Sequence, residues 1–400
     1  MRGELCKNRT RFGFYVMPRS AVSLFGERSS AMPQTPNANS LRLHREGKSV
    51  EPLISRTTFI HFLRFSAAGV VAAAHLRDVM FADYKAVLVR PVWFTGLAGI
   101  TGFAGDAVMI FFVISGWLVG GSLLNRRDSL NPYKDYVVAR VSRLWSVLVP
   151  LFIIQAVCHF PGLFDVYGTY GAVTVVGNLI GLQTVYFDTY AGNFPLWSLA
   201  NETAYYAAFV GLVAAFDARL SKFKRIACVV GVLSYGAILT FQIDVYFSVW
   251  LIGAMATRLR LKSSKKNIVL FASLFMFLIV FKRYNNMVND IIFDVASSVP
   301  LALLLNSIPD SKGAKFERLL AHLAGFSFSL YVIHMPLISL FNFQSSNLMD
   351  MSVRHFDDFC FRLVLLIVLA FIYGKIFEDR YPIIRRWMSK RLTTPIARTA

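Results

Sequence analysis

The sequence has little charge for its length. Only 16% of its 400 residues are Asp, Glu, Lys or Arg, whereas 56% are hydrophobic, and this balance excludes a single water-soluble domain. The four cysteines show no paired spacing, so they indicate neither a disulfide framework nor a metal site. Residues 1–57 contain no apolar segment that could form the core of a signal peptide, and we therefore expect no cleavable signal.

Apolar segments long enough to cross a bilayer recur along almost the whole chain. They predict an all-α fold, that of a polytopic integral membrane protein with about ten transmembrane helices. We place these helices at 58–76, 103–124, 144–160, 196–216, 225–241, 245–257, 267–281, 290–306, 323–343 and 359–377. A further apolar stretch, 172–187, is interpreted as an interfacial or re-entrant helix on the outer face, because an eleventh span would move every later basic loop outside.

Basic residues exceed acidic ones and give a net charge of +19. They lie in the two tails and in the loops after the second, fourth, sixth and eighth predicted spans, whereas the stretch 144–218 contains no Lys or Arg. This is the positive-inside bias of membrane proteins, and it predicts that both termini are cytoplasmic. Basic residues in two predicted outer loops, among them Lys282 and Arg283, depart from the bias.

These patterns divide the chain into three predicted regions. We expect a disordered basic cytoplasmic tail at 1–57, a membrane domain at 58–378 and a basic cytoplasmic tail at 379–400. The basic residues follow the edges of the spans, so the lipid bilayer is the expected environment and no nucleic acid is expected as a partner.

The first predicted span carries an arginine and a histidine, in the stretch RFSAAGVVAAAH. The spacing from Arg64 to His75 is three helical turns with about 20° left over, so both side chains lie on one face, about 16 Å apart along the axis. The pair is either two interfacial anchors, with Arg64 reaching the cytoplasmic headgroups, or part of a site inside the membrane.

A carboxylate, Glu202, lies about two turns into the fourth predicted span, in the stretch PLWSLANETAYY. We expect it near the depth of His75, because the fourth span enters from the outer side. A carboxylate at such a depth needs a partner or water. Glu202 therefore either forms a structural ion pair or orients His75 as a general base.

Two further groups of polar residues have the spacing of one helix face. Ser327, Tyr331 and His334 in FSFSLYVIHMPL stand at i, i+4 and i+7, which favours the lining of a polar cavity over isolated helix–helix hydrogen bonds. Arg140 and Arg143 in ARVSRLW share a face at the inner end of the third predicted span. They are either ordinary positive-inside charges or a phosphate clamp that faces the cytoplasm.

Taken in order, these motifs resemble those of the acyltransferase 3 family, the integral-membrane enzymes that O-acylate bacterial cell-surface polysaccharides and related glycans. The resemblance runs from about residue 58 to 380. It rests on RFSAAGVVAAAH, FFVISGWLVG at 111–120, ARVSRLW, LWSLANETAYY, SLYVIHMPL and FEDRYP at 377–382.

The resemblance implies that an acyl group, commonly acetyl, passes from cytoplasmic acyl-CoA to a sugar hydroxyl on the outer face of a bacterial inner membrane. It implies His75 as the general base, with Glu202 beside it. It also implies Arg64, Arg140 and Arg143 as ligands of acyl-CoA. The remaining candidates for lining the substrate cavity are Trp197, Ser327, Tyr331 and His334.

Acyl-CoA, above all acetyl-CoA, is expected as a co-substrate and a saccharide as the acceptor, with no bound cofactor and no metal. Direct transfer and a relay through His75 both remain open. A proton-coupled transporter or flippase of a glycan or small molecule is the alternative, because intramembrane Arg, His and Glu also mark such carriers. The sequence shows no pair of broken helices in matching halves, which counts against this alternative.

Overall fold

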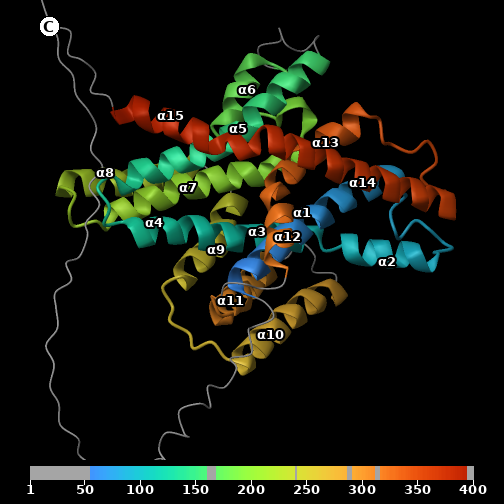
Figure 1. Ribbon diagram of the computed structural model, residues 1–400, viewed down its shortest axis with the longest axis horizontal. Coiled ribbons are helices and arrows are strands. Elements are labelled where there is room, and N and C mark those ends of the chain that lie inside the picture. Colours follow the sequence, from blue (N-terminus) through green and yellow to red (C-terminus); the bar gives the residue numbers. More distant parts are fainter. Residues whose placement is uncertain (1–54, 160–167, 239–240, 286–290, 311–315, 394–400) are drawn as a thin grey trace, which may run out of the picture. The chain divides into compact units, whose positions relative to one another are not determined.

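The computed structural model describes residues 55–159, 168–238, 241–285, 291–310 and 316–393. Helices make up 78% of the structure and no strand occurs among the described residues, so the all-α prediction is confirmed (Figure 1). Residues 1–54 of the tail predicted to be disordered lie outside the described part of the chain. The main helices are α1 (Arg56–Met80), α2 (Val92–Thr101), α3 (Ala104–Ser115), α4 (Gly121–Arg126), α5 (Pro132–Cys158), α6 (Ala172–Leu179), α7 (Trp197–Ala215), α8 (Lys222–Ile238), α9 (Phe241–Ala256), α10 (Lys265–Tyr284), α11 (Ile291–Ser307), α12 (Glu317–Gly325), α13 (Ser327–Leu340), α14 (Val353–Ile376) and α15 (Tyr381–Thr393).

Every predicted span overlaps one of these helices or a pair of them. Within the described residues, five helical segments are long and apolar enough to cross a membrane, and the pair α12–α13, bent by 42°, makes a sixth if it is one span. The protein is therefore a multi-pass membrane protein, while the number ten and the cytoplasmic termini stay predictions. Helix α6, in the stretch 172–187, has only eight residues. At 1.5 Å per residue it is far shorter than the bilayer core of about 30 Å.

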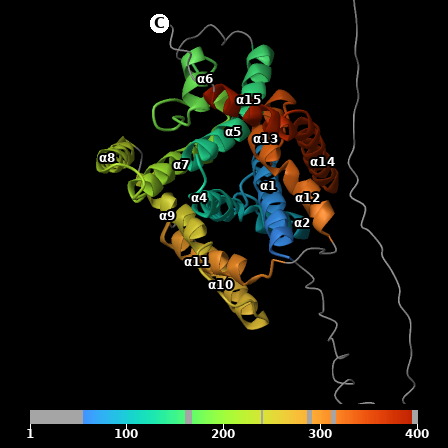
Figure 2. The same ribbon diagram turned by 60° about the vertical axis from the view of Figure 1, so that its left-hand side comes forward.

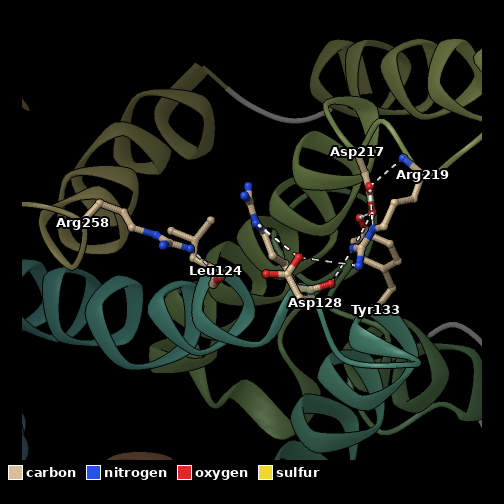
Figure 3. Close-up of polar contacts among 7 residues, drawn as sticks. Leu124, Asp128, Tyr133, Asp217, Arg219 and Arg258 are labelled. Carbon is tan, nitrogen blue, oxygen red and sulfur yellow. Dashed lines mark hydrogen bonds and ion pairs between the residues drawn. The ribbon is translucent and has the colours of Figure 1, made fainter.

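Three of the loops predicted to be cytoplasmic lie together at one end of α4 (Figure 3). Arg219, in the loop after α7, donates a hydrogen bond to the carbonyl of Arg127, and Arg258, after α9, donates to the carbonyl of Leu124. Both arginines satisfy carbonyl groups that the C-terminus of α4 leaves without helical partners. Three loops that are far apart in the sequence therefore share one side of the helices.

The loops predicted to lie outside also meet each other. The backbone N–H of Ala82 donates to the carbonyl of Leu348 at 2.8 Å, and that of Ser345 donates to the carbonyl of Val79 at 3.0 Å. These bonds join the loop after α1 to the loop after α13. The two sets of contacts support the alternation of sides, and the compartment that each side faces rests on the positive-inside bias.

Lys282, one of the exceptions to that bias, is part of a buried ion cluster. Its side chain is 3% exposed, and its Nζ donates to Asp106 Oδ1 at 3.0 Å and to Asp294 Oδ1 at 2.6 Å. Tyr246 donates to the other oxygen of Asp294 at 2.7 Å. A buried ammonium group requires such compensation. Lys282 therefore joins α10 to α3, α9 and α11 and is not a loop charge. In both views α10 and α11 lie at the opposite end of the helices from α6 (Figures 1 and 2).

Glycines bring α9 against α3 and the π-helical turn η2 (Gly116–Gly120) that follows α3. A Cβ atom added at Gly116 would lie 1.9 Å from the carbonyl oxygen of Trp250, and one added at Gly253 would lie 2.1 Å from that of Val113. Only glycine permits this approach, which is typical of small-residue contacts between membrane helices. The stretch FFVISGWLVG thus brings Trp250 next to Ser115, with the indole Nε1 3.1 Å from the Ser115 hydroxyl oxygen.

Candidate active site

A cavity of about 300 Å³ lies between α1, α3, α5, α7 and α13. We call it the charged cavity, because three arginines and one glutamate line it. Six of the residues predicted for the site meet there, from four helices. The polar residues that line it are Arg64, Arg140, Arg143, Glu202, Ser327 and Tyr331, joined by Ser115, Ser198 and Tyr206.

The guanidinium groups of the charged cavity have few protein partners. Arg64 donates to the Ser327 hydroxyl at 3.1 Å, and Arg143 donates to Glu378 Oε1 at 3.0 Å. The Nε of Arg140 is buried without a hydrogen-bond partner among the described residues. Guanidinium groups with unused donors form a site for a multivalent anion such as phosphate.

Glu378 holds Arg143 in place, and sequence reasoning did not single it out. Its side chain is 3% exposed, and Oε2 accepts hydrogen bonds from the Ser329 hydroxyl at 2.7 Å and the Ser329 backbone N–H at 3.1 Å. That N–H belongs to the first turn of α13, where helical partners are missing and a carboxylate is stabilising. The signal was the stretch FEDRYP, which begins at Phe377. After it, α15 packs against α5, so part of the predicted tail 379–400 belongs to the helical assembly (Figure 2).

Glu202 belongs to a chain of hydrogen bonds on the wall of the charged cavity. The Tyr206 hydroxyl donates to Glu202 Oε2 at 2.9 Å and lies 3.2 Å from the Ser115 hydroxyl, which accepts from the indole of Trp250. Ser198, Glu202 and Tyr206 stand at i, i+4 and i+8 on α7, so one face carries all three. This spacing is visible in the sequence and could have identified Tyr206.

The structure does not bring Glu202 to His75. Ser198, one turn before Glu202, is already level with Tyr331, because their hydroxyl oxygens are 2.7 Å apart. The chain reaches this depth before α7 begins, through the short 3₁₀ turn Phe194–Leu196. Glu202 therefore lies deeper than the depth at which we predicted it, next to the arginines.

His75 pairs with His334 instead. His75 Nδ1 and His334 Nε2 are 2.7 Å apart, and the two rings are nearly parallel, at 12°. The other nitrogen of His334, Nδ1, lies 3.2 Å from the carbonyl of Leu330. His334 is fully buried, and the ring of Phe194 packs edge-on against His75 with 4.8 Å between centroids.

These contacts fix the positions of the protons on neutral rings. A carbonyl only accepts, so His334 Nδ1 carries the proton that it donates to Leu330. His334 Nε2 is then an acceptor, and His75 Nδ1–H donates to it. The remaining nitrogen of His75, Nε2, therefore has a free lone pair that can take a proton.

His75, His334 and Trp197 do not line the charged cavity. Tyr331 connects the histidine pair to it, since Tyr331 lines the cavity and its ring centroid is 6.0 Å from that of His334. Trp197 opens α7, and its ring packs edge-on against Phe112 with 6.3 Å between centroids. Trp197 therefore packs between helices and does not line the charged cavity as predicted.

The fold and the site define a multi-pass membrane protein with a buried, positively charged cavity next to a histidine pair. A family model described as an acyltransferase domain matches residues 57–375, most of the chain. The chain belongs to the acyltransferase 3 family, as its motifs indicated, and is a membrane acyltransferase. No curated protein and no solved structure matches it.

Proposed function

We propose that this protein moves an acyl group, commonly acetyl, from cytoplasmic acyl-CoA to a hydroxyl of a saccharide on the outer side of a bacterial inner membrane. The observation that carries the proposal is the convergence of three guanidinium groups in a membrane-embedded cavity that Tyr331 connects to a histidine pair, in which His75 has a free ring nitrogen.

The charged cavity is the proposed donor site. Arg140 and Arg143 stand at i and i+3 on α5, and their guanidinium groups are suited to the phosphates of coenzyme A. Arg64 and His75 lie about 16 Å apart along α1. The extended pantetheine arm of coenzyme A can follow α1 over this distance and carry the thioester toward His75.

His75 is the proposed general base. Its Nε2 takes the proton of the acceptor hydroxyl while the hydroxyl oxygen attacks the thioester carbonyl. The carbon–sulfur bond then breaks, and the coenzyme A thiolate leaves and receives the proton from His75. The hydrogen bond from His75 Nδ1 to His334 persists throughout and keeps Nε2 directed away from His334. This sequence consumes one thioester and forms one ester.

Glu202 has a different role in this proposal from the one that its position in the sequence suggested. It shares the charged cavity with Arg140 and Arg143, and Tyr206 holds its carboxylate. We assign it to the donor site, where it balances guanidinium charge while the site is empty. The orientation of His75 is then the task of His334.

The direct test is release of the coenzyme A thiol by purified protein in lipid nanodiscs supplied with acetyl-CoA and an envelope glycan extract. We expect thiol release with acetylated glycan as product, and loss of both in His75→Ala at equal protein amount. A proton-coupled carrier would release no thiol. An unchanged rate in His75→Ala would contradict the assignment of the base.

A further inference from the structure

A second cavity, of about 320 Å³, lies between the C-terminal parts of α5 and α13, with α14 and the segment 191–193 at its edges. We call it the neutral cavity, because no Lys, Arg, Asp or Glu occurs among the described residues that line it. Most of its wall is apolar. The side chains used in the argument below are Leu151, Ile154, Gln155, Asn193, Met335 and Leu337.

Two carbonyl oxygens in the wall of the neutral cavity lack donors. Gln155 is 6% exposed and Asn193 is 1% exposed, yet Gln155 Oε1 and Asn193 Oδ1 have no hydrogen-bond partner among the described residues. The orientation of the Asn193 amide is determined, because its Nδ2 donates to the carbonyl of Val332 at 3.0 Å. A buried acceptor without a donor is unfavourable, so a donor that reached either oxygen from a molecule in the neutral cavity would stabilise the bound state.

The chemistry of the wall selects that molecule. Without a Lys or Arg side chain the neutral cavity does not suit phosphate or carboxylate, and without a carboxylate it does not suit an ammonium group. Hydroxyl groups are uncharged and can donate hydrogen bonds to isolated carbonyl oxygens. The apolar side chains of Leu151, Ile154 and Leu337 fit the C–H faces of a sugar ring or a hydrocarbon chain.

The position of the neutral cavity fits an acceptor. Gln155 lies about 18 Å beyond Arg143 along α5, toward the side predicted to be outer. Asn193 directly precedes Phe194, whose ring packs on His75, and Met335, which lines the neutral cavity, directly follows His334. The neutral cavity therefore lies beside the histidine pair. Met335 in its wall is the neighbour of His334 in the chain, and Asn193 in its wall is the neighbour of the residue that packs on His75.

We propose that the neutral cavity binds the uncharged saccharide portion of the acceptor, free or joined to a lipid, through hydroxyl donors to Gln155 and Asn193. This inference rests on the proposed function, because that function makes the bound saccharide the acceptor of the acyl group. The binding itself can be measured without any acyl transfer, so the two proposals can fail separately.

The test is photolabelling of the full-length protein in nanodiscs with an octyl glucoside that carries a diazirine in its chain. We expect labelling of the peptides that contain 151–159 and 333–340, competed by excess octyl glucoside. Gln155→Met keeps the length of the side chain and removes the carbonyl, so it should reduce labelling about 2- to 10-fold, the range of one neutral hydrogen bond. Competition by maltotriose would assign the site to free saccharide, and competition by octyl glucoside alone to the lipid-linked form.

The matched control is Gln183→Met. Gln183 is also buried with an unpartnered Oε1, but it does not line the neutral cavity. We expect its labelling to match the wild type at equal amounts of folded protein. Equal labelling of Gln155→Met and wild type would overturn the proposal. So would equal competition by dodecylphosphocholine, because a groove that takes any amphiphile is an ordinary lipid contact.

Discussion

The charged and neutral cavities are built on the same two helices and differ in almost every chemical respect. On α5 one stripe of residues serves both, with Arg140 and Leu144 in the charged cavity and Leu151 and Cys158 in the neutral cavity. On α13 Ser327, Phe328 and Tyr331 line the charged cavity, and residues from Ile333 onwards line the neutral cavity. In the proposed function, this one pair of helices offers a phosphate site and a hydroxyl site at two depths of a membrane, with the histidine pair near both.

The largest effect is expected at His75, the proposed general base. His75→Ala should lower kcat on the order of 100- to 10,000-fold, because a positioned base contributes that much to proton transfer. Transfer of radiolabelled acetyl from acetyl-CoA to glycan, at matched protein amounts, measures it. KM values for both substrates should change little. A shift in KM with unchanged kcat would make His75 a binding residue.

His334 tests how His75 is oriented, since its proposed effect on the reaction is through the hydrogen bond to His75. His334→Phe removes the acceptor for His75 Nδ1–H and should lower kcat about tenfold or more, less than His75→Ala. His334→Gln restores an acceptor and should recover part of the loss, which a purely steric role would not predict. Equal kcat values in His334→Phe and His334→Gln would contradict the proposed positions of the protons.

Lys282 is a charged residue that serves neither cavity. Lys282→Met leaves Asp106 and Asp294 buried without their counter-ion, and breaking such a pair costs about 3–5 kcal/mol. We expect less folded protein and a lower unfolding temperature in nanodiscs. KM for acetyl-CoA should stay at the wild-type value in the protein that folds. A selective KM change would place the cluster in the donor path.

Arg140 tests the charged cavity with little structural loss, because its Nε has no protein partner among the described residues. Arg140→Met should raise KM for acetyl-CoA about 10- to 100-fold, the range of a charge-assisted hydrogen bond to phosphate. Arg258→Met is the matched control, since Arg258 lies in the loop cluster outside both cavities and donates to the carbonyl of Leu124 (Figure 3). The control should leave this KM unchanged. An equal rise of KM in both variants would mean that Arg140 is only one of the positive-inside charges and does not bind acetyl-CoA.

The smallest effect is expected at the loop cluster outside both cavities. The Arg219 guanidinium and the Tyr133 hydroxyl hold the pKa of Asp217 well below its usual range. A depressed pKa stabilises the folded loops above the unfolded value of about 3.9, and this stability is lost as the pH falls below it. Hydrogen–deuterium exchange of the loop amides around Ser129, corrected for the intrinsic effect of pH, should therefore become faster below about pH 4. In Asp217→Asn, the corrected exchange rate should no longer change with pH in that window.

The sequence predicted most of the helices and most of the residues of the charged cavity. It failed to predict contacts that depend on how a helix is rotated and how deep it lies in the membrane. Apolar length located a helix at each of the ten predicted spans, although it missed α2 and α15. The i, i+4 spacing identified Ser327 and Tyr331. The expected contact of Glu202 with His75 did not form, because hydropathy does not reveal that the chain enters the helices before α7 begins. Gln155 gave no signal, since one uncharged amide on an apolar helix becomes informative only when its oxygen is seen without a donor.

The most direct test of the central claim, that the two cavities bind two different substrates, is a cross-comparison of KM values. KM for acetyl-CoA and for the glycan acceptor would be measured in wild type, Arg140→Met and Gln155→Met under the same conditions. We predict that Arg140→Met raises only the KM for acetyl-CoA and that Gln155→Met raises only the KM for the acceptor. If both variants raise the same KM, or if each raises both equally, the division between a charged donor cavity and a neutral acceptor cavity is wrong.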